Sequence, residues 1–362
     1  MNAPGAVITG WGFYVPERVL TNRDLERLVG TTDEWIVERT GIRERRIVAD
    51  DESTSSMATR AARQALDRAG IAGHDLDVII IGTTTPDYLL PTAAALVQEQ
   101  LGAHRAGILD LGAACAGFIY SLAVARGLIA AGTARRVLVV GAETISRYVD
   151  WTDRSTCILF GDGAGAVVVE ASATEHGIAS TVLHGDGSKR ELLTVKGGGS
   201  KHPPTAESVR DGLHHIRMQG NEVFKLAVPS MASAAEEAIA DAGLRIEDVD
   251  LLIPHQANLR IIEAVTKRLR LDPAKVFVNI QKYGNTSAAS IPIALCEAVA
   301  EGRVRQGDRL VFAAFGGGMT WGAAVVRWTA PPLARRPGIL ERAQHELEEL
   351  VSPRRAETTP RG

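Results

Sequence analysis

The chain has 362 residues, of which 45% are hydrophobic and 23% are charged. This is the composition of an ordinary globular protein, and the length suits one large duplicated domain or two domains of common size. The formal net charge of −3 argues against a nucleic-acid-binding protein.

The N-terminal segment and the cysteines indicate a reduced, cytoplasmic setting. Residues 1–8 lack the charged start and long apolar core of a signal peptide. Apolar runs elsewhere are of strand length or are interrupted, so we expect a soluble protein without a membrane span. Cys115, Cys157 and Cys296 are too few for a disulfide framework, and no CxxC or Cys/His spacing predicts a zinc site.

Helices and strands recur along the chain at a fixed offset of 173 residues. The paired segments are 61–70 with 234–243, 76–80 with 249–253, and 136–140 with 309–313. The first pair are alanine-rich amphipathic helices ended by glycine, and the other pairs are continuous apolar strands. A generic α/β protein would also contain similar Ala-Gly helices, but here the register persists across about 80 residues. The sequence therefore predicts two βαβ-rich halves, 1–174 and 175–330.

Cys115 lies where an apolar strand gives way to a helix, within the sequence DLGAACAGF. A thiol at the first turn of a helix lies near the positive end of the helix dipole, which favours the nucleophilic thiolate. Its small neighbours leave room for a second molecule. An isolated cysteine more commonly only packs in a core, so a catalytic interpretation requires partner residues elsewhere in the chain.

Two polar residues follow strands in the second half. His255 follows the strand at 249–253 after a single proline, and Asn285 follows a strand that we predict over 276–280. Taken alone, the histidine suits a structural role and the asparagine suits a helix cap. In the repeat, however, His255 aligns with Gly82 and Asn285 aligns with Gly112, close to the cysteine. The polar residues thus fall at the ends of corresponding strands, where open α/β sheets bind ligands.

The chain changes character after Trp328. Proline and glycine interrupt it at 331–338, and apolar residues then recur at helical spacing up to Val351. We predict that residues 331–362 form a C-terminal extension with a short amphipathic helix and a disordered basic tail. The helix would pack on the body or on a dimer partner, or it would contact another protein.

A series of motifs resembles the thiolase-fold condensing enzymes, most closely the β-ketoacyl-acyl-carrier-protein synthase III family. In chain order they are TDEWIV at 32–37 with RTGI at 39–42, the Cys115 turn, FGDGAGA at 160–166, PHQAN at 254–258, GNTS at 284–287 and FGGGMTWG at 315–322. The resemblance covers residues 5–328. It implies an α/β, thiolase-like fold in which the duplicated halves stack in αβαβα layers.

The resemblance implies a catalytic triad of Cys115, His255 and Asn285, with an oxyanion hole formed by the backbone N–H groups of Cys115 and Gly317. Cys115 would accept an acyl group from acyl-CoA. His255 and Asn285 would then stabilise the enolate formed when malonyl-acyl-carrier protein loses carbon dioxide. The β-ketoacyl product would initiate fatty-acid biosynthesis, and neither a metal nor a cofactor beyond the coenzyme A thioester substrate is expected.

The same resemblance assigns binding surfaces. The coenzyme A and pantetheine positions are Thr31, Trp35, Arg39, Arg154, Gly220 and Asn258. Trp35 and Arg154 would sandwich the adenine ring, whereas the alternative for Trp35 is a place in the core. The carrier-protein docking positions are Lys225, Arg260, Lys267 and Arg268. A basic entrance attracts acidic carrier proteins, although solvated helix faces are also commonly basic.

Two loops are expected to lie at the edge of the active site or of the dimer. Leu90, in the segment 83–91, would cap the acyl pocket of the partner subunit across a homodimer. The polar, glycine-rich segment 188–219 would form a mobile lid. Two other functions stay open: a starter-unit synthase or acyltransferase of the same fold in polyketide or specialised metabolism, and a non-catalytic scaffold subunit. The acyl chain preference and the carrier of the extender, protein or coenzyme A, also stay open.

Overall fold

The first half of the chain builds a five-stranded sheet in a computed structural model that describes residues 4–173 and 177–330. Its order is β1 (Gly5–Tyr14), β7 (Gly163–Ser172), β6 (Arg136–Glu143), β4 (Val78–Gly82) and β5 (Gly107–Leu111). β4 runs parallel to both of its neighbours, whereas β7 is antiparallel to β1 and β6. The middle strands are apolar at nearly every position because helices cover both faces.

A four-stranded sheet follows in the second half, in the order β11 (Leu251–Pro254), β12 (Arg309–Gly316), β13 (Thr320–Arg327) and β8 (Ile178–Gly185). Two-stranded ribbons join β2 (Val19–Thr21) to β3 (Glu44–Arg46) and β9 (Leu193–Thr194) to β10 (Arg217–Met218). Among the residues just delimited, no helix is long and apolar enough to cross a membrane. The predicted extension at 331–362 lies outside the described residues.

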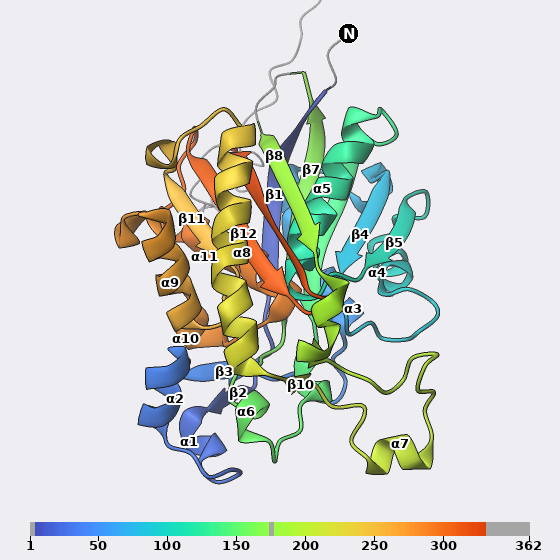
Figure 1. The fold of residues 1–362 in the computed structure, drawn as a ribbon. Helices are drawn as coiled ribbons and strands as arrows, with labels where there is room; N and C mark the ends of the chain where they lie inside the picture. Colours follow the sequence, from blue (N-terminus) through green and yellow to red (C-terminus); the bar gives the residue numbers. More distant parts are fainter. Residues whose placement is uncertain (1–3, 174–176, 331–362) are drawn as a thin grey trace, which may run out of the picture. The chain divides into compact units, whose positions relative to one another are not determined.

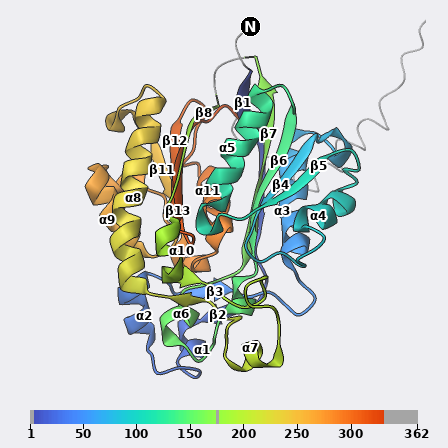
Figure 2. The same ribbon diagram turned by 45° about the vertical axis from the view of Figure 1, so that its right-hand side comes forward.

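Helices separate and cover the two sheets (Figures 1 and 2). α3 (Thr54–Ala69) and α4 (Ala93–Leu101) lie on the outer face of the first sheet, and α8 (Gly220–Asp241) and α9 (Leu259–Leu269) on that of the second. α5 (Gly117–Ala130) and α11 (Ser290–Ala300) lie between the sheets. Both central helices are apolar around most of their circumference, as burial between two sheets requires. The layered αβαβα, thiolase-like prediction is confirmed.

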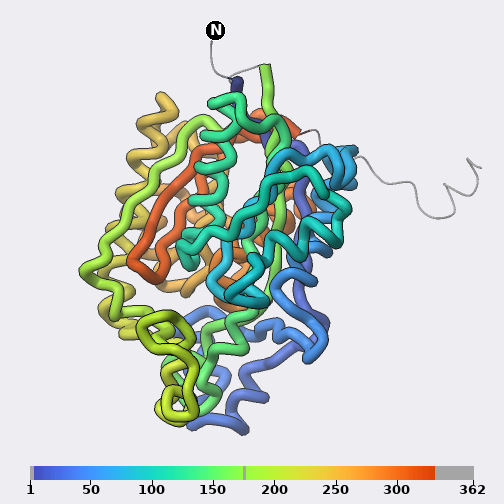
Figure 3. The backbone as a smooth tube through the Cα atoms, turned by 90° about the vertical axis from the view of Figure 1, so that its right-hand side faces the viewer, coloured from blue at the N-terminus to red at the C-terminus, as the bar shows by residue number. Residues whose placement is uncertain are grey.

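Shorter helices connect these layers. They are α1 (Asn22–Leu25), α2 (Asp33–Thr40), α6 (Arg154–Cys157), α7 (Ala206–Arg210) and α10 (Ile280–Tyr283), with 3₁₀ turns η1 (Gly73–Asp75), η2 (Ala114–Ala116), η3 (Ile145–Tyr148), η4 (Gly187–Leu192), η5 (Ile246–Asp248), η6 (Pro273–Lys275) and η7 (Ser287–Ala289). The segment between β9 and β10 that carries α7 stands apart from the layered body (Figure 3). The region expected to be a lid thus contains short regular elements.

The offset of 173 residues reappears in the geometry of two facing turns. η2 precedes α5, and η7 precedes α11 at the equivalent place. Their first residues, Ala114 and Ser287, both have a positive φ, 44° and 50°, which is uncommon for residues other than glycine. Gly141 lies against the second turn, since a Cβ there would be 2.1 Å from the Ala288 carbonyl oxygen. The start of α5 lies against the same turn, since a Cβ on Gly117 would be 3.3 Å from the Ala288 Cβ, so the two turns meet at one place.

The strand predicted over 276–280 is wrong. Only Val276 forms an isolated bridge, to Leu252 of β11. The side chain of Gln256 occupies the ladder beyond that point: its amide nitrogen donates to the Phe277 carbonyl, and its Oε1 accepts the N–H of Asn279 at 3.0 Å. A buried side chain therefore satisfies the backbone groups that another strand residue would have paired.

Candidate active site

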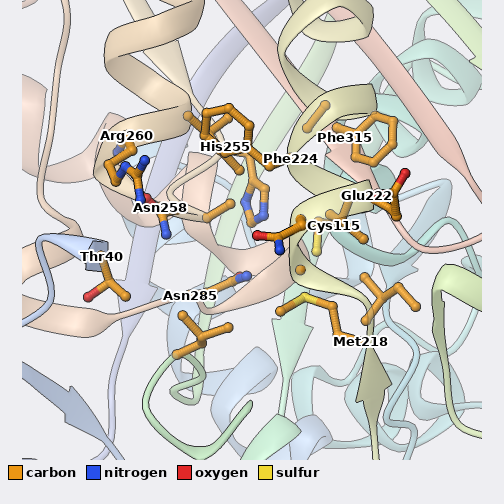
Figure 4. Close-up of a pocket in the computed structure, with 18 of the residues that line it drawn as sticks. Thr40, Cys115, Met218, Glu222, Phe224, His255, Asn258, Arg260, Asn285 and Phe315 are labelled. Carbon is orange, nitrogen blue, oxygen red and sulfur yellow. The ribbon is translucent and has the colours of Figure 1, made fainter. Parts of the chain in front are cut away.

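A cavity of about 460 Å³ opens where the two turns meet, and Cys115, His255 and Asn285 all line it. Their side chains point toward the same space, together with Phe224 and Met218 (Figure 4). Cys115 comes from the first half of the chain, whereas His255 and Asn285 come from the second. The duplicated fold therefore brings together the three residues that the sequence analysis grouped.

Cys115 lies in η2, two residues before the start of α5, at the helix end that the sequence predicts. Burial raises the pKa of its thiol to about 12, the nearby Glu143 carboxylate acts in the same direction, and a hydrogen bond with Ser287 opposes them. Burial therefore opposes the effect of the helix end, which favours the thiolate.

His255 follows β11, and hydrogen bonds hold both its backbone and its side chain. Its backbone N–H donates to the Ala313 carbonyl at 2.8 Å, and its Nδ1 lies 2.6 Å from the Ser290 Oγ. Burial lowers the pKa of the ring to about 3, so the imidazole is neutral at physiological pH. The other ring nitrogen, Nε2, is buried and has no partner. A buried nitrogen without a partner beside a cavity is suited to bind a ligand atom.

Asn285 is held between the halves by its backbone and by its side-chain oxygen. Its N–H donates to the Leu159 carbonyl, and its own carbonyl accepts the N–H of Gly161 at 3.0 Å. The side-chain Oδ1 accepts the Ser287 N–H at 2.8 Å. Because the oxygen is engaged by the backbone, the NH₂ group is the end of the amide that remains for the cavity.

Glu143 is a buried carboxylate that the sequence analysis missed. It ends β6 and accepts hydrogen bonds from Thr83, Thr84, Thr85 and Ser287, the last at 3.0 Å. Desolvation raises its pKa, and these hydrogen bonds oppose that shift. Glu143 thereby ties the loop after β4 to the turn that carries Asn285. No local pattern signals this role, because the partners are distant in sequence.

The glycine-rich loop after β12 presses against the nucleophile turn. A Cβ on Gly316 would stand 2.6 Å from the Cys115 backbone nitrogen, so only glycine permits this approach. The Thr320 hydroxyl lies 2.8 Å from the Ala113 carbonyl oxygen and 3.2 Å from that of Gly317. Gly317 itself does not line the cavity. Its proposed role in the oxyanion hole stays a prediction.

The cavity mouth contains some of the predicted binding residues. Arg39, Gly220, Lys225, Asn258 and Arg260 line it. Asn258 begins α9 by accepting the Arg260 N–H, and its amide donates to the Arg39 carbonyl at 3.0 Å. Lys225 forms a 2.7 Å ion pair with Glu222, which also lines the cavity. A carboxylate therefore accompanies the basic residues at this entrance.

Other predicted residues lie away from the cavity lining. They are Thr31, Trp35, Leu90, Arg154, Lys267 and Arg268. The guanidinium groups of Arg39 and Arg154 lie 4.3 and 4.6 Å from the centre of the Trp35 ring. An adenine ring between Trp35 and Arg154 would therefore have to separate them, since each stacked layer needs about 3.5 Å. Leu90 is 87% exposed, and Lys267 and Arg268 are exposed near the end of α9.

Apolar residues on α8 form a wall of the cavity that sequence reasoning did not predict. Val223, Phe224, Ala227 and Met231 share one face of the helix. Their spacing of three and four residues was a usable signal, but it also describes any helix packed on a sheet. Phe160 and Phe315 add aromatic surface to the same cavity. Within 4–173 and 177–330, no cluster of three or more His, Cys, Asp or Glu suits a metal ion.

The αβαβα fold, with a cysteine before one central helix and a histidine and an asparagine from the other half, defines a condensing enzyme of the thiolase fold, an acyltransferase. Residues 109–187 match the family model described as 3-oxoacyl-[acyl-carrier-protein (ACP)] synthase III. Residues 239–328 match the model of its C-terminal part. The chain belongs to the β-ketoacyl-acyl-carrier-protein synthase III family.

Individual relatives support this assignment along nearly the whole chain. A β-ketoacyl-[acyl-carrier-protein] synthase III of Roseiflexus sp. (strain RS-1) is 52% identical, covering 90% of this chain and 99% of the relative. The crystal structure of 3-oxoacyl-[acyl-carrier-protein] synthase III from Aquifex aeolicus VF5 is 51% identical, with a TM-score of 0.84 and coverage of 90% and 100%. The priming β-ketosynthase of the R1128 polyketide pathway is 36% identical, with a TM-score of 0.85 and coverage of 91% and 98%.

Proposed function

We propose that the protein condenses an acyl-CoA primer with malonyl-acyl-carrier protein, with loss of carbon dioxide, through an acyl thioester on Cys115. The observation that carries this proposal is the convergence of two neutral hydrogen-bond groups, the Nε2 of His255 and the amide of Asn285, on the cavity that contains the thiol. The product would be a β-ketoacyl-acyl-carrier protein that initiates fatty-acid biosynthesis.

The first half-reaction transfers the acyl group. The Cys115 sulfur attacks the thioester carbonyl, the bond to the coenzyme A sulfur breaks, and the thiol proton ends on the released coenzyme A. The oxyanion of the tetrahedral intermediate would accept hydrogen bonds from the backbone N–H groups of Cys115 and Gly317. Loss of one such donor typically costs about 3–4 kcal/mol of transition-state stabilisation. The close approach of the Gly316 backbone to the Cys115 nitrogen, which leaves no room for a Cβ, supports this placement.

The second half-reaction forms the carbon–carbon bond. The malonyl thioester oxygen accepts hydrogen bonds from His255 and Asn285, carbon dioxide departs, and its bonding electrons form the enolate. The enolate carbon attacks the acyl-Cys115 carbonyl, and the cysteine sulfur leaves and takes up a proton. Two neutral donors suit this step, because they stabilise negative charge on oxygen and have little tendency to protonate the carbanion. The low pKa of His255 fits this requirement.

Coenzyme A would enter past the mouth of the cavity. We assign its pantetheine arm to Thr31, Arg39, Gly220 and Asn258, and its adenine to Trp35 and Arg154. The stacking of both arginines on Trp35 supports the adenine site, because a guanidinium over an indole marks a surface that accepts planar groups. Adenine would displace Arg154 from the ring. No further cofactor is needed, since the thioester is itself the activated substrate.

The carrier protein would dock beside the same mouth, on Lys225, Arg260, Lys267 and Arg268. Exposure of all four supports this assignment, while the ion pair of Lys225 with Glu222 reduces the contribution of Lys225.

We also propose a homodimer in which Leu90 reaches the acyl pocket of the partner. The adjoining Tyr88 and Leu89 are exposed as well, an unusual cluster for a free surface. The three unpaired cysteines suit a reducing cytoplasm.

A second candidate function is the priming of a polyketide or another specialised pathway. The similarity to the R1128 priming ketosynthase favours it, and the chemistry at Cys115 would be the same. The difference would lie in the acyl group that is accepted. The aromatic and aliphatic side chains that bound the cavity, such as Phe160, Phe315 and Met231, would select that group by its shape. A non-catalytic scaffold is less consistent with a complete set of Cys115, His255 and Asn285.

Intact-mass measurement of the protein after incubation with a panel of acyl-CoA thioesters tests the proposal. A mass increase equal to the acyl group should appear, and added malonyl-acyl-carrier protein should remove it with release of carbon dioxide. Cys115→Ala should abolish acylation. Acylation without carbon dioxide release would contradict condensation, and no acylation at all would favour the scaffold. A preference for acetyl or short branched groups would support fatty-acid initiation, and a preference for an unusual starter would support the alternative.

A further inference from the structure

Ser290 is a buried serine in contact with the candidate catalytic histidine. It is the first residue of α11 and is 2% exposed. Its Oγ lies 2.6 Å from the Nδ1 of His255 and accepts the backbone N–H of Gln256 at 3.3 Å. The hydroxyl does not line the cavity, so it touches His255 from behind. Any effect of Ser290 on the reaction must therefore pass through the imidazole ring.

The hydrogen-bond inventory of this serine determines the direction of its bond to the ring. A hydroxyl has one hydrogen and two lone pairs, and the Gln256 N–H already points at the oxygen. Among the residues that the structure describes, the only acceptor within reach of the Ser290 hydrogen is the Nδ1 of His255. The hydroxyl therefore donates to Nδ1. Because the ring is neutral, its single proton then resides on Nε2.

We propose that Ser290 is a positioning residue that holds His255 in the Nε2–H tautomer and so directs an N–H donor into the cavity. The inference rests on the proposed function for its consequence, which is that His255 donates to the malonyl thioester oxygen. The opposite tautomer would present a lone pair on Nε2 to the same oxygen, and two lone pairs repel each other. Asn285 receives a parallel constraint from the Ser287 N–H, so both donors are oriented by groups outside the cavity.

This assignment divides the two half-reactions. Acyl transfer to Cys115 uses the sulfur and the backbone N–H groups, so it should be insensitive to the tautomer of His255. Decarboxylation requires the Nε2–H, so it should depend on Ser290. Loss of one preorganised donor to an oxyanion typically lowers the rate about 100- to 1,000-fold. Removal of the hydroxyl frees the orientation of the ring as well as its tautomer, so we expect a loss of about 10- to 100-fold, the range typical when the hydrogen-bond partner behind a metal-binding histidine is removed.

The experiment compares Ser290→Ala with Ser180→Ala, a matched control. Ser180 is also buried and donates a 2.6 Å hydrogen bond, but its acceptor is the Ala238 carbonyl, away from the cavity. Single-turnover acylation by acyl-CoA and decarboxylation of malonyl-acyl-carrier protein are measured separately. Ser290→Ala should lower the decarboxylation rate about 10- to 100-fold and leave acylation within about threefold. Ser180→Ala should change neither rate, whatever it does to stability.

Nitrogen NMR of the full-length protein reads the tautomer directly and independently of activity. With histidine labelled with ¹⁵N, the His255 ring is assigned by its disappearance in His255→Gln. The wild type should show a pyrrole-type Nε2 and a pyridine-type Nδ1, and Ser290→Ala should move both shifts toward each other. A pyridine-type Nε2 in the wild type would overturn the proposal, as would equal losses in both half-reactions of Ser290→Ala. If Ser290→Ala does not fold, Ser290→Cys takes its place, because a thiol is a weaker hydrogen-bond donor than a hydroxyl and should move both shifts in the same direction.

The outcomes also separate this inference from the proposed function. A protein that never decarboxylates malonyl-acyl-carrier protein contradicts the condensing function. The change in the ring nitrogen shifts between the wild type and Ser290→Ala then still confirms or refutes the effect of Ser290 on His255. Conversely, a pyridine-type Nε2 in an active enzyme would leave condensation in place and exclude Ser290 as the residue that sets the donor.

Discussion

The reactivity of Cys115 toward a small disulfide-forming reagent should rise steadily with pH. Burial raises the pKa of its thiol to about 12, whereas an ordinary cysteine has a pKa of about 8.5. At pH 7 the thiolate fraction is therefore about 10⁻⁵, compared with about 3% for an ordinary cysteine. A thiolate of higher pKa is the stronger nucleophile, which recovers about 1.6 of these 3.5 decades. We expect Cys115 to react about 100-fold more slowly than free cysteine.

The assay is the rate of methylthiolation by methyl methanethiosulfonate, followed by intact mass between pH 6 and pH 10. Cys115→Ala reports the background from Cys157 and Cys296, which are also buried. The logarithm of the Cys115 rate should increase by about one unit for each pH unit over the whole range. Restricted access to the cavity would lower every rate by the same factor and leave this slope unchanged.

A plateau in that profile below about pH 9 would refute the reasoning. It would mean that the N-terminal end of α5 and the Ser287 hydrogen bond stabilise the thiolate more than burial destabilises it. A plateau would also restore the thiolate expectation that follows from the position of Cys115 before a helix. The profile thus separates two opposed electrostatic effects on one sulfur atom.

Other predictions concern the glycine-rich loop, the adenine site and the histidine. Gly316→Ala would place a Cβ 2.6 Å from the Cys115 nitrogen, so the rate of acylation should fall about 100-fold or more. The control is Gly187→Ala, whose Cβ would have no neighbour within 4 Å and should leave the acylation rate unchanged. Trp35→Ala should raise KM for acyl-CoA about 10-fold, as expected for lost stacking, and leave KM for an acyl-pantetheine without adenosine unchanged; equal effects on both substrates would argue against the adenine site. His255 has a folded pKa of about 3 and an ordinary value of 6.5, so its stabilising contribution is present above pH 6.5 and is lost as pH falls toward 3. In urea unfolding, His255→Gln should therefore lose about 2 kcal/mol less stability than the wild type between pH 7 and pH 5.

Much of the fold was predictable because it depends on local and periodic features. Gly70 and Gly243 end their helices with φ of 70° in both cases, as a glycine after an amphipathic run predicts. The apolar strands at the common offset became β4 and β11, and β6 and β12. The segment 276–280 did not form a strand, because a side chain from another segment, Gln256, satisfied its backbone. A propensity for extended structure cannot anticipate such a competitor.

The candidate site shows the same division. The sequence identified Cys115, His255 and Asn285, and the structure places all three at one cavity. The sequence did not identify Glu143 or Ser290, which act through partners far along the chain. A glutamate at the end of a strand and a serine at the start of a helix are common in any α/β protein. Their importance follows only from what they contact.

The sequence by itself determined the family, the duplicated layers and the residues that meet at the cavity, because periodicity and ordered motifs are properties of the chain. Tertiary structure decided the chemical state of those residues. It raised the pKa of Cys115 by removing water from the sulfur, lowered that of His255 by the same means, and set a serine behind the imidazole. Solvation and hydrogen-bond direction depend on every segment that surrounds an atom, so they arise only when distant parts of the chain pack together.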